Sequence, residues 1–279
     1  MTVEILNLRE SRLTLEAGVA EFAHQRPERR NPISMELRQD YADMLDRIEG
    51  DPAVRALVIF GEGGVFCAGG DLKGLKERLA SADPAVNSAE AMQRRVGAAH
   101  VWFGRLRDLP IPVVAAVDGA AFGAGLSLAL AADFVLASTR ARFAASFIRI
   151  GMLPDLAALH TLPRLIGLAA AKEMMFTGRA LEAQEARALG LVHAIYPPEL
   201  LREQARAFAA RFVGASAHAL AQTKRMLNRS FESSYETVRD FEASGQGIAS
   251  TTPAHAAALE RFIQGEPPLF DWDRMGPDN

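Results

Sequence analysis

The sequence has 279 residues, of which 49% are hydrophobic and 23% charged, with a formal net charge of −3 and a pI near 6.1. This profile is typical of a soluble globular chain that forms one large domain, or a core with a smaller appendage. The mild acidity excludes a basic surface for nucleic acid or a membrane. Cys67 is the only cysteine, so no intrachain disulfide can form and a reducing compartment is expected.

No apolar stretch reaches the roughly 18 residues of a membrane span, and the first residues show no apolar signal-peptide core. We therefore expect a cytoplasmic protein. No spacing of His, Cys and carboxylate residues indicates a metal site.

The first 25 residues alternate between apolar and polar side chains, which predicts strands at 3–8, 13–15 and 19–23. A charged loop at 26–32 follows. Ser34 is a typical N-cap for the next helix, whose apolar side chains recur at helical spacing as far as Ile48.

The middle of the chain repeats a strand, a glycine-rich loop and a helix. We predict in order a strand at 54–60, a loop at 61–71, a helix from Leu72, a polar loop at 81–88, a helix leading to Leu109, a strand at 111–117, an Ala- and Gly-rich helix ending near Ala132, and a strand at 134–137. Units of this kind favour an α/β core of stacked ββα turns over one open Rossmann sheet.

From residue 199 the chain is predicted to be helical, with the clearest helices at 202–213, 217–229 and 252–264. Thr252 and Pro253 match an N-cap followed by proline at the first helical position. We expect residues 1–198 to form the core and residues 199–279 an oligomerisation element or a lid.

Two segments share one physical design, in which a buried strand leads through a turn of small residues into a helix start. They are residues 68–72 and 119–125. Helix N-termini offer unpaired N–H groups, and small residues allow a carbonyl to approach them closely. Two such groups aimed at one point would form an oxyanion hole. Neither segment fits a dinucleotide fingerprint or a Walker loop, and each taken alone also fits an ordinary tight turn.

The order of the motifs is more specific than either segment. The sequence resembles the enoyl-CoA hydratase/isomerase (crotonase) family over roughly residues 12–265, through RPERRNP at 26–32, FCAGGDL at 66–72, DGAAFGAG at 118–125, AD at 132–133, IGMLP at 150–154, LPRLIG at 162–167, FTGR at 176–179 and ARALGLV at 186–192.

This resemblance implies a crotonase-type spiral of ββα units with a C-terminal helical trimerisation region. It also implies an acyl-CoA thioester as substrate, no separate cofactor, and homotrimers or dimers of trimers. The oxyanion donors would be the N–H groups of Gly70 and Ala124. The substrate-binding residues would be Arg29, Arg30, Ala68, Asp71, Leu72, Phe122, Gly123, Ser127, Phe147 and Pro154.

The sequence departs from the hydratases of that family, which use two glutamates. Ser127 stands at the first of these positions, and the pair Ser146-Phe147 stands where the second is found in a Pro-Glu pair. Adding water to a double bond needs proton transfer at both ends, so hydration by the two-glutamate route is not expected.

Asp155 offers a different carboxylate. Isomerase branches, including the epoxyphenylacetyl-CoA isomerase-like group, place their catalytic base at this position, and shifting a double bond needs only one base and the oxyanion hole. We therefore favour an enoyl-CoA isomerase with Asp155 as base. The alternatives are hydration, another chemistry such as thioester hydrolysis, or non-catalytic acyl-CoA binding. Asp155 is also well placed as a helix N-cap, and Leu156 and Ala157 after it predict an apolar acyl pocket.

Other candidate residues rank lower. Asp71 is expected to cap a helix and hold its loop. His160 and Glu62 could reach the site, although a packed or surface histidine is the simpler interpretation of the former. Cys67 is expected to be a small buried hydrophobe. Residues 264–266 are acidic, where relatives often carry a cation for a coenzyme A phosphate.

Overall fold

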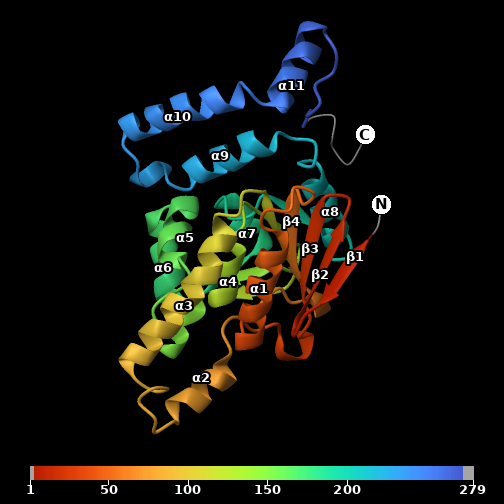
Figure 1. Ribbon diagram of the computed structural model, residues 1–279. Coiled ribbons are helices and arrows are strands. Elements are labelled where there is room, and N and C mark those ends of the chain that lie inside the picture. The colour runs from red at the N-terminus through yellow and green to blue at the C-terminus, as the bar shows by residue number, and fades with distance from the viewer. Residues whose placement is uncertain (1–2, 273–279) are drawn as a thin grey trace.

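The computed structural model describes residues 3–272 and is built around one large, mixed β-sheet (Figure 1). Its seven strands are hydrogen-bonded in the order β1-β2-β3-β4-β5-β7-β10. The first three pair antiparallel and the rest parallel. The strands are β1 (Glu4–Asn7), β2 (Ser11–Glu16), β3 (Val19–His24), β4 (Ala56–Gly61), β5 (Val113–Val117), β7 (Phe134–Ser138) and β10 (Ala194–Tyr196). The predicted N-terminal strands and the later sheet strands are confirmed.

A second sheet of three strands stands apart from the first. Strand β8 (Arg142–Ala144) lies between β6 (Ala120–Phe122) and β9 (Ala180–Glu182), parallel to the first and antiparallel to the second. The prediction that residues after Gly119 enter a helix directly is wrong. A short strand comes first, and helix α4 (Ala124–Ala129) is only six residues long. Alanine-rich sequence misled the prediction because the segment is positioned by pairing with distant strands rather than by its own helical propensity.

Helices α1 (Met35–Ile48) and α3 (Ala89–Arg107) pack against each other on one side of the core, and α2 (Leu72–Leu79) lies below both in Figure 1. The Ser34 hydroxyl accepts a hydrogen bond from the Leu37 N–H over 3.0 Å, which confirms the predicted cap. Residues 81–88 lie outside the helices, as expected.

The remaining elements of the middle region are short. They are η1 (Pro27–Arg29), η2 (Glu62–Gly64), η3 (Ser146–Ile150), α5 (Ala158–Ile166), α6 (Leu168–Thr177) and α7 (Ala183–Ala188).

The C-terminal region is helical, as predicted. Helix α8 (Leu201–Ala210) packs on the large sheet against β3, β4, β5, β7 and β10. Helices α9 (Ala217–Leu227), α10 (Tyr235–Ala249) and α11 (Pro253–Ile263) lie above the core in Figure 1, with η4 (Ser230–Glu232) between the first two. The Thr252 hydroxyl caps α11 by accepting from the His255 N–H. The division of the chain after residue 198 stays a prediction.

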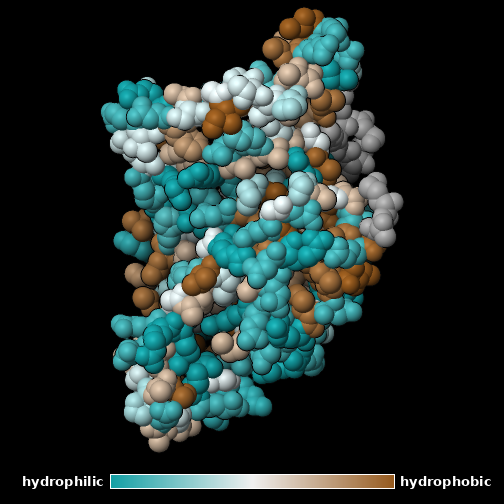
Figure 2. Space-filling view, in the orientation of Figure 1, coloured by the Kyte–Doolittle hydropathy of each residue, from teal (hydrophilic) through white to brown (hydrophobic). Residues whose placement is uncertain are grey.

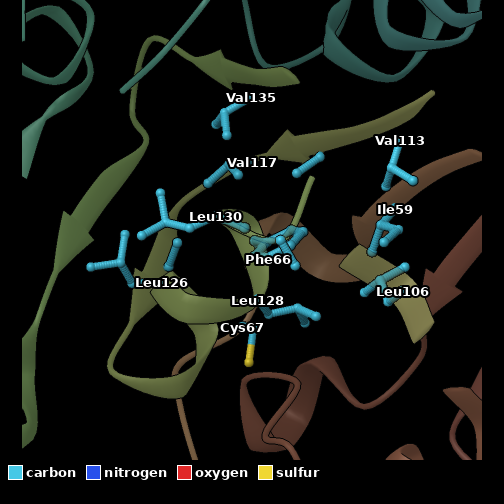
Figure 3. Packing of buried hydrophobic residues seen from close by; sticks show 14 of the residues in the cluster. Ile59, Phe66, Cys67, Leu106, Val113, Val117, Leu126, Leu128, Leu130 and Val135 are labelled. Atoms are coloured by element: carbon cyan, nitrogen blue, oxygen red, sulfur yellow. The ribbon is translucent and has the colours of Figure 1, made fainter. Parts of the chain in front are cut away.

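The core is apolar and contains α4 at its centre. Figure 3 shows Leu126 and Leu128 of α4 among side chains from β4, β5, β7 and α3, such as Ile59, Val117 and Leu106. A helix buried on all sides cannot shift without opening this packing, so the start of α4 is held rigidly. No helix within residues 3–272 combines the length and apolarity needed to cross a membrane.

Candidate active site

The two glycine-rich segments singled out in the sequence lie side by side. The Cys67 N–H donates to the Ala120 carbonyl over 2.9 Å, and the Phe122 N–H donates to the Cys67 carbonyl over 3.1 Å. Cys67 and Ala121 thereby form an isolated parallel bridge. Since β6 carries straight into α4, this bridge brings the residues after Cys67 next to the N-terminus of that helix.

Two glycines permit this close approach. A Cβ added to Gly125 would lie 2.2 Å from the Cys67 carbonyl oxygen, and one added to Gly69 would lie 3.0 Å from the Phe122 carbonyl oxygen. Gly69 also has φ +118°, a region that strongly favours glycine. A side chain at either position would push the two segments apart.

The N–H groups of Gly70 and Ala124 are both available to a ligand. Neither donates in the backbone hydrogen bonds of the described residues. Ala124 is the first residue of α4, whose N–H has no partner within the helix. Both residues border the same cleft of about 320 Å³. A carbonyl oxygen bound there could receive two backbone hydrogen bonds.

This cleft collects most of the residues predicted to bind substrate. Its lining includes Ala68, Gly70, Asp71, Leu72, Phe122, Gly123, Ala124, Phe147 and Asp155. Four predicted residues do not line it: Arg29, Arg30, Ser127 and Pro154. Arg29 pairs with Asp71 over 3.2 Å, and the Arg30 carbonyl accepts from the Ala68 N–H. Both arginines therefore lie beside the loop at the rim of the cleft.

Asp155 lies in the cleft with one carboxylate oxygen buried. Its Oδ1 has no hydrogen-bond partner within the described chain. The prediction that Asp155 caps a helix is wrong, because α5 begins at Ala158 and its N-cap is Ala157, without a side-chain hydrogen bond. Leu156 and Ala157 both have positive φ, at 46° and 59°. Two successive left-handed residues without glycine are strained, and they separate Asp155 from the first residue of α5.

Ser127 holds this loop through a hydrogen bond to its backbone. Its hydroxyl donates to the Asp155 carbonyl oxygen over 2.9 Å, and the side chain is almost fully buried. Ser127 was predicted to bind substrate, but its side chain does not line the cleft. It links α4, which carries the Ala124 N–H, to the backbone of the carboxylate.

The surroundings of Asp155 raise the pKa of its carboxyl group above the usual value. Burial is the largest cause, because it disfavours the charged form, and the nearby positive charges of Arg38 and His100 partly oppose it. A carboxylate held in this way is a stronger base than one in water.

The inner end of the site differs from the apolar pocket that the sequence predicted. A smaller cavity of about 90 Å³ shares Gly70, Ala124 and Asp155 with the cleft. Apolar side chains such as Ile33 and Leu156 form part of its wall, but so do Arg38 of α1, Arg78 of α2 and Arg95 of α3. This cavity is therefore not purely apolar, and the apolar acyl pocket stays a prediction. Sequence reasoning missed these arginines because each lies on a different helix, and only the packing of the helices brings them together.

The other candidate residues lie outside the reacting region or are occupied elsewhere. Asp71 stands at the N-cap position of α2 but makes no capping hydrogen bond. Glu62 pairs with Arg12 over 2.8 Å. Cys67 is fully buried, and burial raises the pKa of its thiol to about 12, which confirms its role as a small hydrophobe.

A larger cavity of about 500 Å³ lies between α9 and the core, and it contains neither Gly70, Ala124 nor Asp155 in its wall. His160 borders this cavity and not the cleft, and its Nε2 lies 3.2 Å from an Arg107 nitrogen, which fits the simpler interpretation as a packed or surface histidine. Among the described residues, no group of three or more His, Cys, Asp or Glu side chains could hold a metal ion.

Comparisons with known proteins agree with this geometry. Residues 14–271 match the model of the enoyl-CoA hydratase/isomerase family. The 1,2-epoxyphenylacetyl-CoA isomerase of Escherichia coli (strain K12) is 30% identical over 92% of this chain and 96% of its own. The short-chain-enoyl-CoA hydratase of Clostridium acetobutylicum is 30% identical over 90% of this chain and 94% of its own.

A solved structure gives the same answer. The crystal structure of an enoyl-CoA hydratase/isomerase from Cupriavidus metallidurans CH34 superposes with a TM-score of 0.89 at 39% identity, covering 95% of this chain and 97% of that one. These matches confirm the resemblance first indicated by the motifs. The chain belongs to the enoyl-CoA hydratase/isomerase family.

Proposed function

We propose that the protein is an enoyl-CoA isomerase that moves a carbon–carbon double bond, with Asp155 as its base. The observation that carries this proposal is the position of Asp155. Asp155 lies in the cleft that also presents the Gly70 and Ala124 N–H groups, and one of its carboxylate oxygens has no hydrogen-bond partner. Within residues 3–272, no other acidic side chain in this cleft is free of an ion pair. Asp71, the other acid in that cleft, is engaged with Arg29.

The reaction follows from these three groups. The thioester oxygen of a 3-enoyl-CoA accepts hydrogen bonds from the two N–H groups. Asp155 removes a proton from C2, and the electron pair moves onto the thioester oxygen to give a dienolate, whose negative charge the two donors stabilise. Asp155 then returns the proton to C4, which leaves the double bond between C2 and C3. One carboxylate serves both steps, so no second acid is required.

Two replacements speak against hydration. Ser127 spends its hydroxyl on the Asp155 carbonyl, and Phe147 offers only a ring to the cleft. Neither can orient water and move its proton. Relatives carry both names, hydratase and isomerase, so hydration is the outcome against which isomerisation is tested.

The test is an assay of a panel of 2-enoyl- and 3-enoyl-CoA esters in isotopically labelled water, with the products separated by chromatography and weighed by mass spectrometry. We expect the two enoyl esters to interconvert with no gain of a water molecule, and solvent hydrogen to enter only to the extent that the Asp155 proton exchanges with water. A 3-hydroxyacyl-CoA carrying the labelled oxygen as the main product would show a hydratase instead. Release of free coenzyme A would show a hydrolase, and no turnover of any ester would leave only an acyl-CoA binder.

We further propose a cytoplasmic homotrimer or dimer of trimers assembled through the C-terminal helices. The support is the exposure of large apolar side chains there, among them Phe262 at 82% and Ile263 at 74%. Figure 2 shows such residues as a brown patch at the tip of α11, with another beside α5 and α6. Coenzyme A enters as part of the substrate, with no separate cofactor. Sedimentation velocity measures the assembly, and a monomer at micromolar concentration would contradict it.

A further inference from the structure

The inner cavity next to Asp155 is lined by three arginines from three helices, and few acidic groups lie near them to balance their positive charges. The Nε atoms of Arg38, Arg78 and Arg95 are buried and have no hydrogen-bond partner among the described residues. The side chains of Arg38 and Arg78 make no hydrogen bond or ion pair within residues 3–272. Arg95 donates one hydrogen bond to the Val86 carbonyl over 2.9 Å and a weak one to the Met92 sulfur, and neither acceptor is charged.

Such a cluster favours an anion. The three side chains are half-buried, each with its Nε atom shielded from water, and like charges repel each other. Arg38 shows both effects, since burial and the charges of Arg78 and Arg95 lower its pKa, while Asp155 acts in the opposite direction. Of the three arginines, Arg38 acts on the carboxyl group of Asp155 and lowers its pKa, and that carboxylate is the proposed base. The cavity has donors left over for a second anion.

The position of the cavity indicates where that anion belongs. Its wall includes both oxyanion residues, Gly70 and Ala124, together with Asp155. If the thioester oxygen lies at the two N–H groups and Asp155 reaches C2 and C4, the acyl chain runs past Asp155 into this cavity. The sulfur and the rest of coenzyme A leave in the other direction, through the outer cleft lined by Ala68 and Leu72; Arg38 and Arg78 stand where the two spaces meet, and Arg95 borders only the inner one.

We propose that the acyl group of the preferred substrate ends in a carboxylate, which is bound by Arg38, Arg78 and Arg95. The substrate class is then the coenzyme A monothioester of an unsaturated dicarboxylic acid. The guanidinium fork matches a carboxylate geometrically, and charge-assisted hydrogen bonds of this type are stronger than neutral ones. This proposal rests on the proposed function for the direction of the acyl chain.

The experiment measures binding without turnover. Saturated thioesters cannot be isomerised, so calorimetric dissociation constants of adipoyl-CoA and hexanoyl-CoA compare two chains of equal length that differ only in the terminal group. Glutaryl-CoA with pentanoyl-CoA, and suberoyl-CoA with octanoyl-CoA, extend the comparison to other lengths. We expect at least one dicarboxylic thioester to bind about tenfold or more tightly than its partner. No preference at any length would overturn the proposal.

Variants separate the acyl carboxylate from the phosphates of coenzyme A. Arg78→Met should remove most of the preference while leaving the binding of hexanoyl-CoA and of free coenzyme A within about twofold. Equal weakening of all ligands would instead assign Arg78 to the phosphates and overturn the proposal. Arg94→Met is the matched control, because Arg94 is exposed on the same helix as Arg95 and pairs with Glu90. If Arg78→Met fails to fold, Arg95→Met tests the same loss of preference for the dicarboxylic thioester. The comparison of ligands on the wild-type protein tests the proposal without any variant.

The two proposals fail in distinguishable ways. A binding preference for the dicarboxylic thioesters with no isomerisation of any enoyl ester would remove the proposed reaction and keep the arginine site. Isomerisation of monocarboxylic esters with no binding preference would keep the proposed reaction and remove the arginine site.

Discussion

The Ser127 hydroxyl donates a hydrogen bond to the Asp155 carbonyl oxygen over 2.9 Å. Ser127 occupies the position at which the hydratases of the family are expected to carry their first glutamate. In this protein the same position supports the loop of a different carboxylate. The helix that presents one oxyanion donor is thereby tied directly to the base.

Replacing Ser127 by alanine should loosen that loop. We expect kcat for isomerisation to fall roughly tenfold with little change in KM, and the free energy of unfolding to fall by about 1 kcal/mol, the typical net value of one hydrogen bond. Steady-state kinetics and thermal denaturation measure both. Ser216→Ala is the control, since it removes the cap of α9 at a similar cost in stability and should leave kcat unchanged. An unaltered kcat in Ser127→Ala would mean that the hydrogen bond does not position the base.

Asp155→Asn should abolish proton transfer but not binding. Loss of a positioned base lowers the rate by about 10²–10⁴-fold, whereas the dissociation constant of a saturated acyl-CoA should change little because the two N–H donors remain. Stopped assays and calorimetry give the two quantities. Full activity in this variant would exclude Asp155 from the mechanism.

The same substitution should not destabilise the protein at neutral pH. The folded-state pKa of Asp155 is raised, mainly by burial, so the folded protein prefers the protonated form. This contribution to stability is fully present below the unfolded-state pKa and is lost as the pH rises through the folded-state value. At pH 7 the ionised group therefore costs stability, and Asp155→Asn should have an equal or higher melting temperature. A clear loss would indicate that the carboxylate is bound by a partner.

The pH dependence of kcat/KM should report the titration of Asp155. Activity requires the carboxylate form, so it should rise with pH through the raised pKa and then level off. The positive charge of Arg38 holds this pKa down, so Arg38→Met should move the rising limb to higher pH. Arg94→Met should leave the limb in place. A shift to lower pH in Arg38→Met would contradict this assignment.

Gly125→Ala should damage both the site and the fold. The added Cβ would lie 2.2 Å from the Cys67 carbonyl oxygen, so the two segments that carry the donors must separate. We expect a loss of stability of about 1–3 kcal/mol and a loss of activity larger than that predicted for Ser127→Ala. Gly104→Ala in α3 is the matched control, because no atom lies within 4 Å of its added Cβ, and it should stabilise the helix slightly. Wild-type activity in Gly125→Ala would show that the two segments need not be in contact.

Most of the fold could be predicted from the sequence, because long strands and helices leave local periodic patterns. The exceptions depend on distant partners. Strand β6 is three residues long and is held by pairing with β8 and with Cys67, and α4 is correspondingly shorter than its alanine-rich sequence indicated.

Some residues of the site could be predicted from the sequence and others could not, because the latter depend on partners that are distant in the chain. Backbone donors follow from glycine-rich turns, so Gly70 and Ala124 could be located by motif, and Asp155 by its place after Pro154. Its role as a cap was misjudged because the left-handed conformations of Leu156 and Ala157 are not visible in their residue types. Arg38, Arg78 and Arg95 lie on three separate helices, and nothing local marks them as neighbours.

The bridge between Cys67 and Ala121 has a consequence for how this enzyme could be redesigned. Because both oxyanion donors are main-chain groups held by main-chain hydrogen bonds, exchanging the cleft-lining side chains at positions 147 and 155 leaves the donors in place. Acidic side chains could therefore be tried at either position around a constant oxyanion hole. A library that varies these two positions and keeps Ser127 and the glycines would search different acyl-CoA chemistries on one fixed scaffold.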